Sequence, residues 1–170
     1  MNKLCCAAVI LALASPALLM AADDNPDAAF YKKAAEGGIA EVNLGKLAQD
    51  KSPTPSVKEF GAMMVTDHTA ANDKLKAIAE RRNIKLPTSP SVCQLATNTK
   101  LEVLSGSAFD ESYIKAMVED HEEDIKLFQK EANSGQDADA KAYAAATLPT
   151  LKGHLKKIQA IASAQGVDVD

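Results

Sequence analysis

Residues 30–48 read FYKKAAEGGIAEVNLGKLA, and the spacing of their apolar side chains predicts one long amphipathic helix. Small or apolar residues recur at alternating intervals of four and three, which keeps them in one stripe along a helix. The stripe consists of Phe30, Ala34, Gly37, Glu41, Leu44 and Ala48. Glu41 is the one ionisable residue in it, so the same stretch predicts both a helix and a buried carboxylate.

The same periodicity continues through most of the chain. The first helix extends over residues 27–50. The same periodicity predicts three more long helices, over residues 55–83, 108–134 and 137–165, and a short one over residues 91–104. The connection from residue 84 to 107 begins with the rigid link LPTSP (residues 86–90) and is about 24 residues long. That length can span a bundle, because a helix of 25 residues is roughly 37 Å long. We therefore predict an all-α, ferritin-like four-helix bundle with a long crossover, carrying the short helix, between its second and third long helices.

The composition excludes several classes of protein. A chain of 170 residues suits one domain with a sizeable core. Its 23 acidic residues outnumber its 19 basic ones, so it has no basic surplus with which to bind nucleic acid. There is no Trp and no glycine-rich phosphate loop, and we expect neither a nucleic-acid partner nor an organic cofactor.

The first 22 residues have the pattern of a secretory signal peptide. Lys3 precedes an apolar run that ends at Ala21 and Ala22, directly before two aspartates. We expect cleavage near Ala22 and a mature domain over residues 23–170 in the periplasm, without a membrane span; association with the outer membrane stays open. Cys93 is then the one remaining cysteine, so no internal disulfide can form, and we expect this thiol to be buried by packing.

The distribution of histidine is the main pointer to function. The chain has three histidines, and each lies on the apolar stripe of a different long helix: His68, His121 and His154. The remaining long helix carries Glu41, and helix lengths place all four residues within roughly 7 Å of one level. Burying such side chains is costly unless they are paired or bind a metal. The pattern predicts a mononuclear site for a divalent transition metal, with Zn, Fe or Mn favoured over Cu.

Two further expectations concern the residues next to the predicted metal site. Gly37 and Gly38, beside Glu41, are expected to let helices approach closely. Asp67 or Asp120 is expected to accept a hydrogen bond from one of the imidazoles.

Other interpretations of the four residues remain open at this point. They can form a metal-free Glu–His hydrogen-bond cluster in a structural or interaction module of the cell envelope, with a homo-oligomer or an envelope protein as partner. A di-iron site is disfavoured, because Val65, Val118 and Leu151 stand where Glu-x-x-His motifs need carboxylates. Enzymatic activity is uncertain and not favoured, since four protein ligands tend to close a metal site.

Four blocks of the sequence resemble a known family. They are AEVNLGKLA (residues 40–48), MVTDH (residues 64–68), FDESY (residues 109–113) followed by His121, and LPTLKGHL (residues 148–155). The chain resembles the exported bacterial ferritin-like proteins grouped as domain of unknown function 4142, often labelled outer membrane proteins. The resemblance implies a ferritin-like bundle beyond the inner membrane, and the four candidate ligands fall within its blocks. Because the family's activity is unsettled, we expect a role in metal storage, sensing or envelope stress from the residues themselves.

Overall fold

The computed structural model describes residues 26–169, which form five α-helices and no strand. The helices are α1 (Ala28–Lys51), α2 (Pro55–Arg81), α3 (Val92–Glu102), α4 (Gly106–Ser134) and α5 (Ala138–Gln165). Their bounds agree with the predicted ranges to within about two residues at each end. The predicted signal peptide, residues 1–22, lies outside the described residues.

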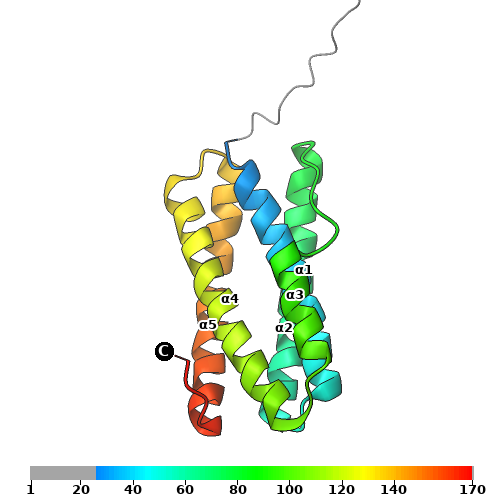
Figure 1. The fold of residues 1–170 in the computed structure, drawn as a ribbon. Coiled ribbons are helices and arrows are strands. Elements are labelled where there is room, and N and C mark those ends of the chain that lie inside the picture. The colour runs from blue at the N-terminus through cyan, green and yellow to red at the C-terminus, as the bar shows by residue number, and fades with distance from the viewer. Residues whose placement is uncertain (1–25, 170) are drawn as a thin grey trace, which may run out of the picture.

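The long helices form a bundle of two antiparallel hairpins, α1 with α2 and α4 with α5 (Figure 1). Between them the chain crosses the full length of the bundle through α3, which lies along α1 and also contacts α4. The crossover returns the chain to the end at which α2 began, so that α4 runs parallel to α2. This arrangement confirms the predicted four-helix bundle with one long crossover.

Local sequence signals explain where the helices begin and end. α3 starts with a capping box, in which the Ser91 hydroxyl accepts from the Gln94 amide N–H and the Gln94 side chain accepts from the Ser91 amide N–H. Asn83 follows α2 with a φ of 56°, and Gly166 ends α5 with a φ of 67°. Both are residue types that tolerate the left-handed conformation of a helix terminus.

The apolar core is divided into two clusters along the bundle. The first surrounds Phe60, Met64 and Ile158, and the second surrounds Phe30 and Phe128. In each long helix one ionisable residue separates the stretches that belong to the two clusters. These residues are Glu41 in α1, His68 in α2, His121 in α4 and His154 in α5. A single polar layer therefore crosses the middle of an otherwise apolar interior.

Two glycines set the distance between α1 and α2 next to this layer. A Cβ atom added to Gly45 would lie 2.6 Å from the carbonyl oxygen of Gly61, and one added to Gly61 would lie 2.6 Å from that of Gly45. Real side chains essentially never approach a backbone oxygen so closely. The expected close approach therefore occurs here and not at Gly37, which has ordinary van der Waals room, or at Gly38, where the neighbour is the Asn72 side chain.

We predict that Gly45→Ala or Gly61→Ala lowers the free energy of unfolding by about 1–3 kcal/mol, because the two backbones must separate. The matched control is Gly153→Ala in α5, where an added Cβ meets no atom within 4 Å. That variant should be neutral or more stable, by up to about 1 kcal/mol, because Ala favours helix over Gly. Urea unfolding measures all three, and equal effects at the three positions would contradict the close approach.

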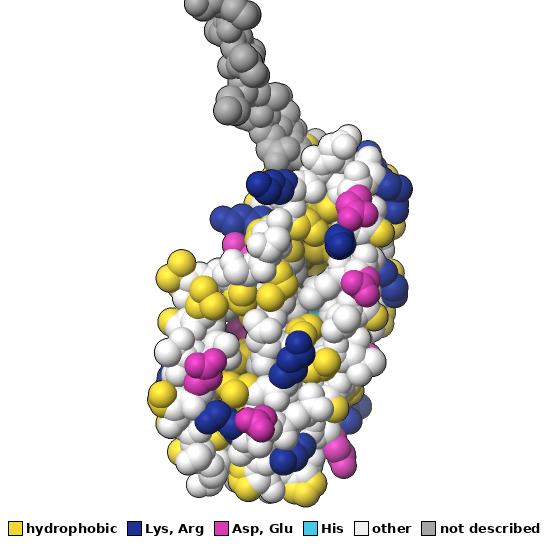
Figure 2. All heavy atoms as spheres, turned by 90° about the vertical axis from the view of Figure 1, so that its right-hand side faces the viewer, with side chains coloured by type: hydrophobic (Ala, Val, Ile, Leu, Met, Phe, Trp, Pro, Cys, Tyr) yellow, Lys and Arg dark blue, Asp and Glu magenta, His cyan; other side chains and the backbone are white. Residues whose placement is uncertain are grey.

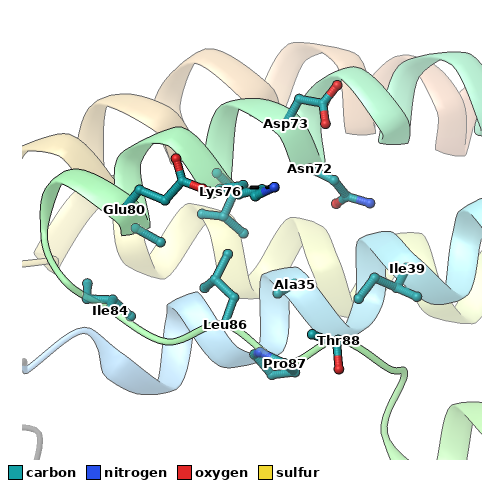
Figure 3. Close-up of a pocket in the computed structure, with 12 residues that line it drawn as sticks. Ala35, Ile39, Asn72, Asp73, Lys76, Glu80, Ile84, Leu86, Pro87 and Thr88 are labelled. Atoms are coloured by element: carbon teal, nitrogen blue, oxygen red, sulfur yellow. Dashed lines mark ion pairs between the residues drawn. The ribbon is translucent and has the colours of Figure 1, made fainter.

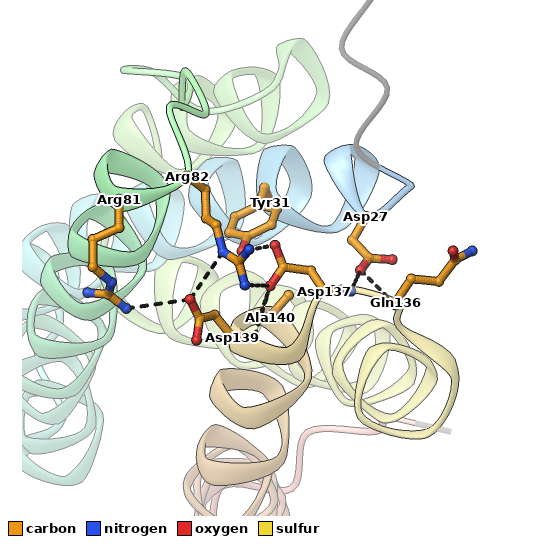
Figure 4. Close-up of polar contacts among 8 residues, drawn as sticks. All are labelled: Asp27, Tyr31, Arg81, Arg82, Gln136, Asp137, Asp139 and Ala140. Atoms are coloured by element: carbon orange, nitrogen blue, oxygen red, sulfur yellow. Dashed lines mark hydrogen bonds and ion pairs between the residues drawn. The ribbon is translucent and has the colours of Figure 1, made fainter.

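Polar contacts close the end of the bundle at which α1 begins (Figure 4). Arg82, just after α2, pairs with Asp137 at 3.0 Å and with Asp139 at 3.1 Å. The Tyr31 hydroxyl donates to Asp137 at 3.2 Å, and the Asp27 carboxylate accepts from the Gln136 and Asp137 amide N–H groups. These contacts join the first turn of α1, the end of α2 and the turn between α4 and α5.

Glu131 lies buried near this end of α4, beside Asp27. Burial, and then the negative charge of Asp27, raise the pKa of the Glu131 carboxyl to about 7. The folded protein therefore keeps a proton that an unfolded Glu releases near pH ~4.3. It follows that the contribution of Glu131 to stability falls as the pH rises from about 4.5 to about 7 and is constant above that.

We predict that Glu131→Gln flattens this part of the pH dependence and makes the protein more stable than wild type above pH 7, by on the order of 1–2 kcal/mol. The amide has the shape and a hydrogen-bond donor of the protonated acid. Thermal unfolding at pH 5 and pH 8 tests this, with the exposed Glu122→Gln as control. An unchanged difference between the two pH values in Glu131→Gln would show that the carboxyl is ionised in the folded protein.

The prediction that the Cys93 thiol is buried is wrong. Cys93 is exposed, because α3 is a short helix on the outside of the bundle that buries only Leu101.

On the face shown in Figure 2, hydrophobic side chains and charges of both signs are interspersed. Beneath the link that leads to α3, a cavity of about 330 Å³ lies between α1 and α2, and Ile84 and Leu86 of the link line it (Figure 3).

Candidate metal centre

The polar layer brings the four predicted site residues together. Glu41, His68, His121 and His154 are all buried, with exposed fractions of 5% or less. One ring nitrogen from each histidine lies within 4.8 Å of the corresponding nitrogens of the other two. Glu41 contacts two of the rings, with 2.7 Å from Oε2 to His68 Nδ1 and 3.4 Å from Oε1 to His121 Nε2. The prediction that these side chains converge from four helices is confirmed.

Each imidazole has an oxygen acceptor close to one of its nitrogens; His121 also has a more distant one, since Glu41 Oε1 lies 3.4 Å from its Nε2. His68 Nδ1 faces Glu41 Oε2, and His121 Nδ1 lies 2.8 Å from the carbonyl oxygen of Met117. His154 Nε2 lies 2.9 Å from Oδ2 of Asp67. Because a carbonyl or carboxylate oxygen can only accept, we place the proton of each neutral ring on the nitrogen that lies nearest to such an oxygen. The surrounding structure thus assigns one N–H to each ring.

The other nitrogen of each ring is then left with a lone pair. His68 Nε2 has no hydrogen-bond partner in the structure. His121 Nε2 and His154 Nδ1 lie 3.4 Å apart, and with neutral rings both are acceptors, so no bond forms between them. A buried acceptor without a donor costs roughly 1–3 kcal/mol. Three such nitrogens close together favour a bound cation, and imidazoles that donate outward and offer a lone pair inward are typical of metal ligands.

The charges of the site are consistent with this arrangement. Burial alone would raise the pKa of the Glu41 carboxyl, but the nearby His68 and His121 hold it below its usual value. Burial likewise opposes protonation of His68, yet the Glu41 carboxylate and its hydrogen bond keep the pKa of His68 raised. Burial lowers the pKa values of His121 and His154. The carboxylate and the two imidazoles with lowered pKa values are in the forms that metal binding requires, and His68 must release any proton on its Nε2 to bind an ion.

The carboxylates of α4 lie farther from the imidazoles. Burial, and then the charge of Glu41, raise the pKa of Asp120 to about 7, and the pKa of Asp124 is also raised. No described contact joins either group to an imidazole, so of the two aspartates expected as imidazole partners the structure selects Asp67. The half-buried positions of Asp120 and Asp124 also show that the acidic segment of residues 119–124 is not solvated along its whole length.

Sequence reasoning did not identify two groups that touch the site. One is the Met117 carbonyl, which lies four residues before His121, as a helical backbone acceptor does; that spacing could have indicated it. The other is Phe60, whose ring meets those of His121 and His154 edge-on at centroid distances of 6.1 and 6.4 Å. Phe60 lies next to Gly61 in α2, and no sequence signal placed it beside the histidines.

We predict that Glu41→Ala, with metal removed by a chelator, lowers the free energy of unfolding by about 3–5 kcal/mol, because it strands a buried N–H of His68. Glu41→Gln should cost less, since the amide oxygen still accepts. Glu80→Ala, an exposed residue of α2, should stay within about 0.5 kcal/mol of wild type. Urea unfolding decides, and a Glu41→Ala variant as stable as Glu80→Ala would contradict the buried contact.

Comparison with known proteins gives a family and a fold. A family model described as "Domain of unknown function (DUF4142)" matches residues 13–161. A crystal structure of a Streptomyces coelicolor protein described as a secreted protein DUF305 superposes with a TM-score of 0.74 over 88% of this chain and 98% of that chain, at 13% identity. At that identity the likeness concerns the fold alone. None of the curated proteins compared with the chain matches it.

Across residues 26–169, no helix is both long and apolar enough to cross a membrane. The similar structure is described as secreted.

Proposed function

The chain belongs to the family described as "Domain of unknown function (DUF4142)", which assigns no activity, and we propose that it is an exported protein that binds one divalent transition-metal ion in its bundle core. His68, His121 and His154 supply imidazole nitrogens, and Glu41 lies beside them as a fourth ligand or as the acceptor that orients His68. The observation that carries the proposal is the buried convergence of three ring nitrogens, each with its partner nitrogen donating outward.

The charge of the surroundings supports a divalent ion. Two carboxylates, Glu41 and Asp67, contact the imidazole cluster, and together they balance two positive charges. A buried ion with matched charge avoids most of the desolvation cost that an unbalanced one carries. Nitrogen and oxygen ligands of this kind suit Zn, Fe or Mn, and imidazoles alone also suit Cu.

The degree of burial bears on what the ion would do. All three histidines and Glu41 are no more than 5% exposed, so an ion among them is shielded from solvent and from large substrates. We therefore favour metal storage, sensing or an envelope-stress role over turnover of a substrate. The signal peptide pattern of residues 1–22 supports the periplasm as the place in which this occurs.

We predict that the mature protein, produced without a histidine tag, contains close to one metal ion per chain by elemental analysis. His68→Ala or His121→Ala should lose this metal, because each removes one of three ligands. Asp139→Asn, a change far from the site, should keep it. A protein that carries no metal and takes up no Zn, Fe or Mn would remove the proposal and leave a metal-free envelope module as the reading of the polar layer.

Metal removal supplies a second measurement. Binding at a free concentration of 1,000 times the dissociation constant adds about 4 kcal/mol of stability. For a domain of this size a chelator should then lower the melting temperature by roughly 10 °C. Glu41→Gln distinguishes a metal-binding protein from a metal-free module. In a metal-free module, this variant lowers the melting temperature by the same amount with and without chelator.

A further inference from the structure

Asp67 differs from every other described residue that contacts the imidazole cluster. Its Oδ2 lies 2.9 Å from His154 Nε2, and 40% of its side chain is exposed. The other contacting groups belong to Glu41, Met117 and Phe60, which are no more than 1% exposed. Among these contacts, Asp67 is therefore the one that touches both an imidazole and solvent.

A groove leads to this carboxylate along the outside of the bundle. It has a volume of about 620 Å³ and lies between α2 and α5. Small side chains such as Ala70 and Ala146 form much of its wall, and Lys74 also lines it. Because the two helices are antiparallel, Asp67 and Thr150 lie toward one end and Arg81 and Asp139 toward the other. Arg81 pairs with Asp139 at 3.8 Å at that far end. His154 follows Thr150 by about one helical turn, directly behind Asp67.

We propose that Asp67 is the entry point of the metal ion: its carboxylate binds the hydrated ion in the groove and passes it to the imidazoles beside His154. This inference rests on the proposed function, since it describes how the same site is filled. A carboxylate at the end of a solvent groove attracts a divalent cation and replaces part of its water shell. The carboxylate also lies 2.9 Å from Nε2 of His154, the ring whose other nitrogen, Nδ1, faces the cluster.

A second acidic region offers the competing route. Asp120 and Asp124 line a pocket of about 410 Å³ on the α4 side, together with Glu36 and Glu123. Charge alone would favour this pocket for a cation. However, no described contact joins its carboxylates to an imidazole, whereas Asp67 touches His154 directly. Contact with a ligand therefore favours the α2–α5 groove.

The test is the rate at which the metal-free mature protein takes up Co²⁺, followed by stopped-flow absorbance. Asp67→Asn keeps an oxygen acceptor for His154 and removes only the charge. We expect its association rate constant to fall about tenfold or more and to depend less on salt. Asp67→Glu keeps the charge and should load at close to the wild-type rate, which also guards against a folding defect. Asp139→Asn, at the far end of the groove, should load like wild type.

Each other outcome overturns the inference in a distinct way. If Asp67→Asn leaves association unchanged and speeds dissociation, Asp67 only orients His154. If Asp124→Asn slows loading and Asp67→Asn does not, the ion enters on the α4 side. If wild-type protein takes up no Co²⁺ at all, the proposed function fails as well. If wild-type protein and Asp67→Asn both load, and equally fast, only the role of Asp67 in entry fails.

Discussion

The contact between the Glu41 carboxylate and the His68 imidazole, 2.7 Å long and almost entirely buried, is the interaction on which the middle of this bundle depends. A carboxylate in an apolar interior is tolerated only with partners of opposite charge or with hydrogen-bond donors. Glu41 therefore requires the histidines to lie at its own level, and the histidines require Glu41, Asp67 and the Met117 carbonyl to accept their protons. This mutual requirement fixes the register of all four long helices.

The rest of the architecture serves that register. Apolar clusters lie on both sides of the polar layer, so that water is excluded from it along the bundle axis. The reciprocal contact of Gly45 and Gly61 holds α1 close to α2 about one turn from Glu41. Because the two helices are close at this level, the Glu41 carboxylate can contact the His68 imidazole directly. At the far end, Arg82 and its two aspartates join the hairpins. The apolar clusters, the glycine contact and the ion pairs thus position the site, although none of them contributes a candidate ligand.

Sequence reasoning predicted the helices, the crossover and the four converging residues, because periodicity of three and four residues specifies which face of a helix is buried. It was wrong where the outcome depended on a neighbouring element. Cys93 is exposed because α3 lies on the outside of the bundle and buries Leu101 alone, and helix periodicity in so short a segment does not say which face is buried. The close helix contact falls at Gly45 and not at Gly37, because the crossing point of two helices is a property of the pair.

The amino-acid sequence is enough to predict an all-α bundle with one ionisable residue on the buried stripe of each long helix. That follows from local spacing alone, since side-chain direction in a helix repeats every 3.6 residues. Helix packing, by contrast, sets which nitrogen of each ring donates and places Asp67, not Asp120, against His154. It also forms the groove between α2 and α5 that ends at the Asp67 carboxylate. Hydrogen bonds act over about 3 Å between residues far apart in the chain, so they are set by how helices rotate and shift against one another.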